Sequence, residues 1–230
     1  MNAAALAPLL VVARALDDLL EHVVFVGGAV LPLLVTDTAA AAFRPTDDVD
    51  LIVHVATFID YTRLGERLRA RGFRVDVEPG APICRWRLGD LRVDVMPDEG
   101  NVLGFKNTWY RSALARPMFF DVEGVRLPII DAPHFCATKL EAWDDRGAAD
   151  VYAHDLEDLI AVVDGRRELL AELAHAPADV DAFVAGRVRD LLQDRAFVEA
   201  LPGHLPGDSG SQARLPIVER RLREIAARAR

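Results

Sequence analysis

Residues 25–29 of this chain are Phe-Val-Gly-Gly-Ala, and residues 44–53 are Arg-Pro-Thr-Asp-Asp-Val-Asp-Leu-Ile-Val. The first stretch predicts a strand that ends at a glycine pair, where the backbone turns into the next element. The second predicts a strand with carboxylates at alternate positions. Because alternate side chains of a strand share one face, Asp48 and Asp50 point the same way while Val49 is buried on the other side. The two stretches therefore predict a paired-carboxylate edge beside a glycine turn.

This pairing of glycines and carboxylates indicates a particular chemistry. Two carboxylates so close together repel each other unless a cation lies between them. Their hard oxygen atoms suit Mg²⁺, or the similar Mn²⁺. A glycine turn lets backbone amides approach a phosphate closely. The sequence therefore predicts a metal-dependent site that handles phosphate.

A third carboxylate is expected, because phosphoryl transfer at a pair of metal ions needs more oxygen ligands and a group that accepts a proton. Residues 84–96 predict two alternating strands joined by a tight turn. Asp94 lies in the second of these strands, between Val93 and Val95. An aspartate in an apolar strand is costly to bury unless it is paired or coordinated, so Asp94 is the predicted third carboxylate.

The apolar periodicity predicts an α/β (α+β) fold, in which a mixed sheet with flanking helices is followed by a helical C-terminal half. We expect one region over residues 1–130 that carries the site, and a helical region over 131–230. Residues 201–211, rich in Pro and Gly, predict a linker before a last helix over 215–230. The other predicted helices span 3–20, 29–42 and 57–71, and the predicted strands span 22–26, 48–55, 73–78, 82–88, 91–96, 118–122 and 125–127.

Composition excludes several classes of protein. A formal net charge of −9 argues against a protein that holds nucleic acid by bulk electrostatics. No run of apolar residues is long enough to predict a membrane span, and the first 20 residues predict an amphipathic helix instead of a signal peptide. Two cysteines, Cys84 and Cys136, do not make a disulfide framework, which favours a cytoplasmic location.

The helical half carries a polar cluster of its own. Lys139 is one of only two lysines and lies at the margin of a predicted apolar helix stripe. Asp155 and Asp158 lie three positions apart, and therefore on one face of the next predicted helix. Taken alone, this pair fits equally well a solvated helix start, where carboxylates interact favourably with the helix dipole.

Together these motifs support a family resemblance. The glycine pair, the Asp-x-Asp and the later strand Asp resemble the nucleotidyltransferase superfamily with the DNA polymerase beta-like fold. Within it, the chain is similar to the AbiEii/AbiGii-type nucleotidyltransferases, which include toxins of abortive-infection and toxin–antitoxin modules. The motifs are weak singly and specific as a set, which comprises Arg44-x-Thr46-x-Asp48-x-Asp50, Lys139-Leu-x-Ala, Arg146-Gly147 and Asp155-x-x-Asp158.

The resemblance implies transfer of a nucleoside monophosphate from an NTP to an acceptor hydroxyl, with Mg²⁺ or Mn²⁺ as cofactor. Many members have Gly-Ser where this chain has two glycines, so backbone amides must replace a hydroxyl contact to phosphate. The implied metal ligands are Asp48, Asp50 and Asp94, the implied nucleotide-binding residues are Gly27, Gly28, Arg44, Thr46 and Lys139, and the implied catalytic residues are the three metal ligands with Lys139, Asp155 and Asp158.

The acceptor and the partners stay open at the level of sequence. RNA such as tRNA, or a protein hydroxyl, is the implied acceptor, and an antitoxin protein is an implied partner. A small molecule of the aminoglycoside type is a rival acceptor. A non-catalytic nucleotide-binding module is an alternative from another class, and it has no need of Asp94. A metal phosphohydrolase built on His134, His154 and Asp155 is a further alternative, which leaves the N-terminal carboxylates unused.

The last predicted helix is locally basic. Its arginines include Arg220, Arg221 and Arg223, with Leu222 and Ile225 on the opposite face. This spacing favours a solvated face with an apolar stripe packed inward. A local contact with RNA is the alternative.

Overall fold

The computed structural model describes residues 3–42, 46 and 48–229. It divides into two compact units. Unit 1 comprises Met1–Pro32 and Pro45–Asp131, and unit 2 comprises Leu33–Arg44 and Ala132–Arg230. The helical half is therefore joined by an internal segment, Leu33–Arg44, which the sequence assigned to the first region. Within the described residues, no helix is long and apolar enough to cross a membrane.

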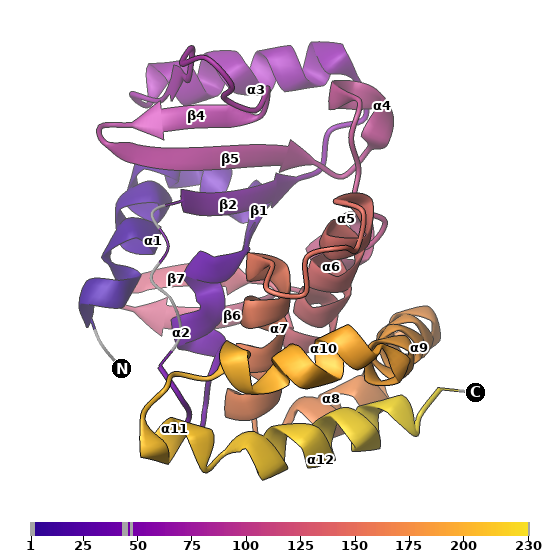
Figure 1. Cartoon of the computed structure of the whole chain (residues 1–230). Helices are drawn as coiled ribbons and strands as arrows, with labels where there is room; N and C mark the ends of the chain where they lie inside the picture. Colours follow the sequence, from indigo (N-terminus) through magenta and orange to yellow (C-terminus); the bar gives the residue numbers. More distant parts are fainter. Residues whose placement is uncertain (1–2, 43–45, 47, 230) are drawn as a thin grey trace. The chain divides into compact units, whose positions relative to one another are not determined.

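Unit 1 is built on a seven-stranded mixed sheet (Figure 1). The strand order is β3-β4-β5-β2-β1-β7-β6. β2 pairs in parallel with β5, and β1 with β7, while the other neighbours are antiparallel. The mixed α/β class predicted from the alternating pattern is confirmed. The strands are β1 (Val23–Val26), β2 (Asp48–Val53), β3 (Arg74–Val75), β4 (Arg85–Leu88), β5 (Leu91–Pro97), β6 (Met118–Val122) and β7 (Val125–Ile129).

One helix of unit 1 covers the apolar face of the sheet at β4 and β5. Helix α3 (Phe58–Ala70) starts at Thr57, whose side chain accepts a hydrogen bond from the Asp60 amide. Its Tyr61 hydroxyl donates to the Val95 carbonyl at 2.9 Å. The other helical elements wholly within this unit are α1 (Ala3–Leu16), η1 (Asp17–His22), η2 (Gly28–Val30), α4 (Gly100–Leu103) and α5 (Tyr110–Leu114).

Three predicted elements are shorter than expected. The helix predicted over 29–42 ends with the short α2 (Leu31–Leu34). Beyond it, the amides of Thr36 and Asp37 donate to the Gly165 carbonyl, at 3.0 and 2.8 Å, so they cannot continue a helix. The helix predicted over 3–20 changes to a 3₁₀ helix at Asp17, which has a φ of 53°. The strand predicted over 73–78 is only the two-residue β3.

Unit 2 is helical and buries a continuous apolar core. Leu222 and Ile225, predicted to face inward, are 0% and 1% exposed. Residues 201–211 are not an open linker, because they contain η3 (Leu201–His204) and the start of α11 (Ser209–Gln212). The elements are α6 (Ala132–Asp145), α7 (His154–Gly165), α8 (Leu169–His175), α9 (Ala178–Gln193), α10 (Arg195–Ala200), η3 (Leu201–His204), α11 (Ser209–Gln212) and α12 (Leu215–Ala226).

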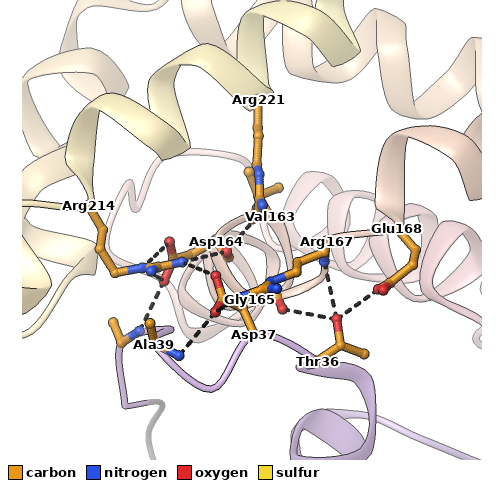
Figure 2. A network of polar contacts seen from close by, with 11 residues as sticks. Thr36, Asp37, Ala39, Val163, Asp164, Gly165, Arg167, Glu168, Arg214 and Arg221 are labelled. Atoms are coloured by element: carbon orange, nitrogen blue, oxygen red, sulfur yellow. Dashed lines mark hydrogen bonds and ion pairs between the residues drawn. The ribbon is translucent and has the colours of Figure 1, made fainter.

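An ion-pair network holds the internal segment in unit 2 (Figure 2). We call Asp37, Asp164, Arg167 and Arg214 the loop network. Arg214 Nε donates to Asp164 Oδ1 at 2.7 Å, and its Nη2 donates to Asp37 Oδ2 at 3.0 Å. Arg167 Nη2 donates to Asp37 Oδ1 at 2.7 Å. Because these contacts join residues far apart in the sequence, residues 36–41 are held by contacts with the helices of unit 2 instead of by their own helical propensity.

Arg221 of α12 is part of the same structure. Its Nη1 donates to the carbonyl oxygen of Val163 at 2.8 Å and to that of Asp164 (Figure 2). These are carbonyls of the last turn of α7, where a helix leaves acceptors without partners in the helix. Arg221 therefore caps the C-terminal end of α7. The solvated basic face predicted for α12 does not include this residue.

Candidate functional site

The register of three strands assembles the candidate site. In the β4–β5 hairpin Arg85 is paired with Asp94, and in the parallel β5–β2 pair Asp94 is paired with Asp50. Residues paired directly across neighbouring strands point to the same side of a sheet. Asp48 lies two positions before Asp50 and shares that side. The sheet thus brings all three predicted carboxylates onto one face, together with Arg85.

A second row of charged residues lies beside the first. Arg87 of β4 is paired with Arg92 of β5, and Arg92 is paired with Asp48 of β2. The residues between the two rows point to the opposite face and are buried, with Trp86 at 3% and Val93 at 0% exposed. Burial of this alternate set fixes the register, because a slip by one residue would bury the charged set instead. We call Asp48, Asp50, Asp94, Arg85 and Arg92 the sheet network.

Arg85 contacts two of the carboxylates in the sheet network. Its Nε and Nη2 donate to Asp94 Oδ1 and Oδ2, each at 2.8 Å. Nη2 also donates to Asp48 Oδ2 at 3.3 Å. The hydrogen bonds that Arg85 donates to Asp94 raise the pKa of Arg85, outweighing the opposite effect of burial. A planar guanidinium therefore bridges two of the three predicted metal ligands.

Asp48 has an oxygen that is not fully satisfied. Arg92 Nε lies 2.6 Å from Asp48 Oδ1 and forms an ion pair with it. Among the described residues, however, that oxygen is shielded from solvent and accepts no hydrogen bond of acceptable geometry. Arg92 therefore supplies the charge partner of this oxygen without a well-aligned hydrogen bond. A cation bound at Asp48 Oδ1 would compete with Arg92 for it.

Gly27 places the end of β1 directly against Asp50. Val26 is paired with Asp50 across the β1–β2 ladder. Gly27 has a φ of 70°, and a Cβ added there would lie 2.7 Å from Asp50 Cγ. Only glycine fits both the backbone angle and the approach. The predicted glycine turn and the predicted Asp-x-Asp are therefore in contact, and Gly28 follows as the first residue of η2.

Thr46 lies at the other end of the carboxylate edge. Its Oγ1 accepts a hydrogen bond from the Asp48 amide at 3.4 Å. With Arg87 and Arg92 it also lines a cavity of about 320 Å³, which is completed by Pro8, Asp90 and Leu91. Two guanidinium groups therefore line a space next to Asp48. Arg44, the other predicted nucleotide-binding residue of this stretch, lies outside the described residues.

The carboxylates offer the hard oxygen donors that Mg²⁺ prefers, and Asp48 Oδ1 is a suitable ligand atom. Across residues 3–42, 46 and 48–229, however, no three His, Cys, Asp or Glu side chains converge as a metal cluster. Asp48 and Asp50 fit as a two-carboxylate metal edge, while the Asp94 side is taken by Arg85.

The predicted residues of the helical half come together within unit 2. Lys139 of α6 lies with its Nζ 2.5 Å from Asp158 Oδ2 and 3.4 Å from Asp155 Oδ1, both on α7. Arg146 pairs with the other Asp155 oxygen. The side chains of Lys139 and both aspartates are at most 14% exposed, so this cluster is held away from bulk solvent. The solvated helix start that the sequence left open does not describe it.

The histidines do not form a second metal site. His134 is fully buried, and His154 Nδ1 lies 2.9 Å from Glu157 on its own helix. Since the described residues contain no three-residue metal cluster, the phosphohydrolase alternative has no structural support.

Cys84, which precedes Arg85, is not a nucleophile. Burial, followed by the nearby charge of Asp94, raises the pKa of its thiol to about 12. A thiol needs to ionise to react, so burial and the charge of Asp94 both disfavour a nucleophilic role for Cys84.

A larger cavity, of about 910 Å³, lies near the start of β1, away from the carboxylates. Arg14, His22, Phe119 and Arg126 are among its lining residues. Its two arginines already have partners, because Arg14 pairs with Glu123 and Arg126 stacks on the ring of Phe119, which lines the same cavity. No predicted site residue lines this cavity.

Comparison with known proteins identifies the fold. No family model matches the sequence, and no functionally curated protein does so either. Among solved structures, an antigenic nucleotidyltransferase-like protein from Paracoccidioides brasiliensis matches with a TM-score of 0.52 and 18% identity, over 92% of this chain and 98% of that one. A candidate nucleotidyltransferase from H. pylori matches with a TM-score of 0.50 and 14% identity, over 99% and 96%. The chain has a nucleotidyltransferase fold.

A further solved structure, that of the antibiotic-resistance factor ANT(2'')-Ia, matches more weakly. Its TM-score is 0.46 at 15% identity, over 89% of this chain and all of that one. A match at this level does not bear on substrate. The comparisons establish the nucleotidyltransferase fold. Because all the identities are low, the reaction has to be argued from the residues of the site.

Proposed function

We propose that this chain is a divalent-metal-dependent nucleotidyltransferase, which moves a nucleoside monophosphate from an NTP to an acceptor hydroxyl and releases pyrophosphate. The observation that carries the proposal is the row Asp94–Asp50 beside Gly27, with Asp48 on the same face. A surface that serves only to form ion pairs does not need a glycine in contact with a carboxylate. A site in which the backbone must approach both a carboxylate and a phosphate needs such a glycine.

The residues have distinct roles in this proposal. Asp48 and Asp50 hold Mg²⁺ or Mn²⁺, which when bound neutralises charge on the phosphates and orients them. The backbone at Gly27 and Gly28 approaches the triphosphate, taking the place of a side-chain hydroxyl. Thr46, together with Arg44, contributes further polar groups at the nucleotide. Catalysis is then chiefly positioning and charge stabilisation by this chain.

Lys139 is the proposed phosphate contact from unit 2. Asp155 and Asp158 fix its ammonium between them, which limits the conformations of a flexible side chain. The two aspartates thus act as positioning residues for Lys139. Lys139→Met should raise the KM for NTP at least about tenfold. Arg195→Met, a change in an exposed pair with Glu199, is the control and should leave KM unaltered.

RNA such as tRNA, or a protein hydroxyl, is the proposed acceptor. The cavity beside Asp48 is lined by Arg87 and Arg92, and both guanidinium groups also pair with carboxylates, Arg87 with Asp76 and Arg92 with Asp48. With a net charge of −9, any contact with RNA must be local and sensitive to salt. In the cell, we propose, the chain acts in the cytoplasm as the toxin of a toxin–antitoxin or abortive-infection module, and an antitoxin protein is its partner.

Label transfer tests the proposal and the acceptor together. The full chain is incubated with each α-labelled NTP, Mg²⁺, and total RNA, total protein or an aminoglycoside panel. We expect label on RNA or on protein, and we expect Asp48→Ala and Asp50→Ala to abolish it. Label only on aminoglycosides would overturn the proposed acceptor. Nucleotide binding without label on any acceptor would favour a non-catalytic binding module.

A further inference from the structure

Arg85 has no role in the proposed function, although it occupies the centre of the sheet network. Its guanidinium is fixed by two hydrogen bonds to Asp94 and by one to Asp48. A metal ion shared by these two carboxylates would need the same space. Arg85 and Asp94 are also well shielded, with side chains 17% and 12% exposed. A bidentate pair in such a place is stronger than an exposed one.

The charge of the site is altered by this arrangement. A guanidinium does not lose its proton in a protein, so Arg85 contributes a permanent positive charge. Arg92 adds a second positive charge next to Asp48, but its side chain is 39% exposed and more strongly screened. Three carboxylates that would attract two divalent cations are thus largely neutralised before any metal arrives.

We propose that Arg85 is a resident cation that takes the place of a second metal ion, so that the chain binds one divalent cation through Asp48 and Asp50. Asp94 then serves as the anchor of Arg85 and is not a metal ligand. The lack of a three-residue cluster among the described side chains agrees with this. The inference rests on the proposed function, because that function makes Asp48 and Asp50 the metal ligands.

Binding of Mn²⁺ to the nucleotide-free full chain tests the inference without an activity assay. The EPR signal of free Mn²⁺ gives both the number of ions bound and their affinity. We expect one Mn²⁺ per chain in the wild type and the same number in Asp94→Asn. Arg85→Gln should bind a second Mn²⁺ and tighten the first about tenfold or more, because a nearby positive charge is removed. Arg85→Lys keeps the charge and should keep one ion.

Arg63→Gln is the control. Arg63 belongs to α3 of the same unit, but its side chain is exposed and pairs with Asp60 instead of the candidate carboxylates. It should bind Mn²⁺ as the wild type does. Circular dichroism of each variant shows whether it is folded. Should Arg85→Gln fail to fold, Asp94→Asn and Arg85→Lys still decide the question.

Two results would overturn the inference alone: two Mn²⁺ ions in the wild type, one of them lost in Asp94→Asn, or an unchanged count and affinity in folded Arg85→Gln. A different result would overturn the proposed function as well. This would be absence of Mn²⁺ binding in every variant, or binding that survives Asp48→Asn combined with Asp50→Asn. The two failures are therefore distinguishable.

Discussion

Unit 1 and unit 2 each contain an arginine–aspartate network, and the two differ in how completely their oxygens are used. In the loop network, Asp37 and Asp164 accept hydrogen bonds on all four carboxylate oxygens, from Arg167, Arg214 and the amides of Ala39 and Ala41. In the sheet network, the shielded Oδ1 of Asp48 forms an ion pair with Arg92 at 2.6 Å but, within the described part of the chain, accepts no well-aligned hydrogen bond. The same residue types thus build a closed structural clamp in one unit and an incomplete polar site in the other.

The comparison teaches that the hydrogen bonding of the carboxylate oxygens says more about the role of a network than its residue types do. A network that is complete in itself stabilises the fold and leaves little capacity for a ligand. A network in which one carboxylate oxygen lacks a well-aligned hydrogen bond is less stabilising, and it keeps the capacity to bind a ligand. Substitutions in the sheet network should therefore change chemistry, and substitutions in the loop network should change stability.

The largest expected effect is in the sheet network. Asp50→Asn keeps the shape of the side chain but removes the charge that holds the metal, so the rate of nucleotidyl transfer should fall about 10³-fold or more. The free energy of unfolding should change by less than about 1 kcal/mol. Rates from pyrophosphate release and urea unfolding curves measure the two quantities. A large loss of stability with unchanged turnover per folded molecule would reverse the comparison.

The next effect is in the loop network. Arg214→Gln leaves buried Asp164 without its cationic partner and Asp37 with Arg167 alone, which should cost about 3–5 kcal/mol of unfolding free energy. Urea denaturation measures this cost. Arg223→Gln is the control, because Arg223 forms only an exposed pair with Glu219 and should cost less than about 0.5 kcal/mol. Equal costs for the two variants would show that the loop network is not a clamp.

Gly27 and Gly124 separate backbone strain from the contact with Asp50. Both have positive φ, at 70° and 77°, but a Cβ at Gly124 meets nothing within 4 Å. Gly124→Ala should therefore cost only the strain of a left-handed alanine, about 1–2 kcal/mol. Gly27→Ala should cost a further 1–3 kcal/mol or so, because Asp50 must move, and transfer activity should fall with it. Similar stability and activity in both variants would remove the argument for a close approach at Gly27.

The smallest effect is a pH dependence in the loop network. The hydrogen bond from Arg167, followed by the Ala39 amide, holds the pKa of Asp37 well below its ordinary value of 3.8. A lowered pKa in the folded state gives stability that is present above the ordinary pKa and is lost as the pH falls below it. The stability difference between wild type and Asp37→Asn should therefore be larger at pH 6 than at pH 3. Urea unfolding at the two values measures it, and an unchanged difference would contradict the assignment.

Much of the site in unit 1 could be predicted from the sequence. Strict alternation of polar and apolar residues placed Asp48 and Asp50 on one face and Asp94 in a later strand. Arg85 was missed, although the signal was available. A two-residue turn at Gly89 and Asp90 fixes the hairpin register and pairs position 85 with position 94.

Other features depended on contacts that no local pattern shows. The helix predicted over 29–42 is present only as far as Leu34, because Asp37 is held by Arg214, 177 positions away. The apolar periodicity of residues 29–42 favours a helix, but tertiary ion pairs override this local preference beyond Leu34. The shift of Leu33–Arg44 into unit 2 follows from the same contacts. The pairing of Lys139 with Asp155 and Asp158 likewise depends on how α6 packs on α7, which helical spacing alone does not give.

The position of the label in the NTP tests the central claim most directly. The chain is incubated with Mg²⁺, cellular RNA and protein, and an NTP labelled at either the α- or the γ-phosphate. Nucleotidyl transfer predicts that α-label becomes attached to the acceptor, that γ-label leaves in pyrophosphate, and that both events are lost in Asp50→Asn but kept in Asp37→Asn. Transfer of γ-label to the acceptor, or α-label transfer that survives Asp50→Asn, would contradict the account.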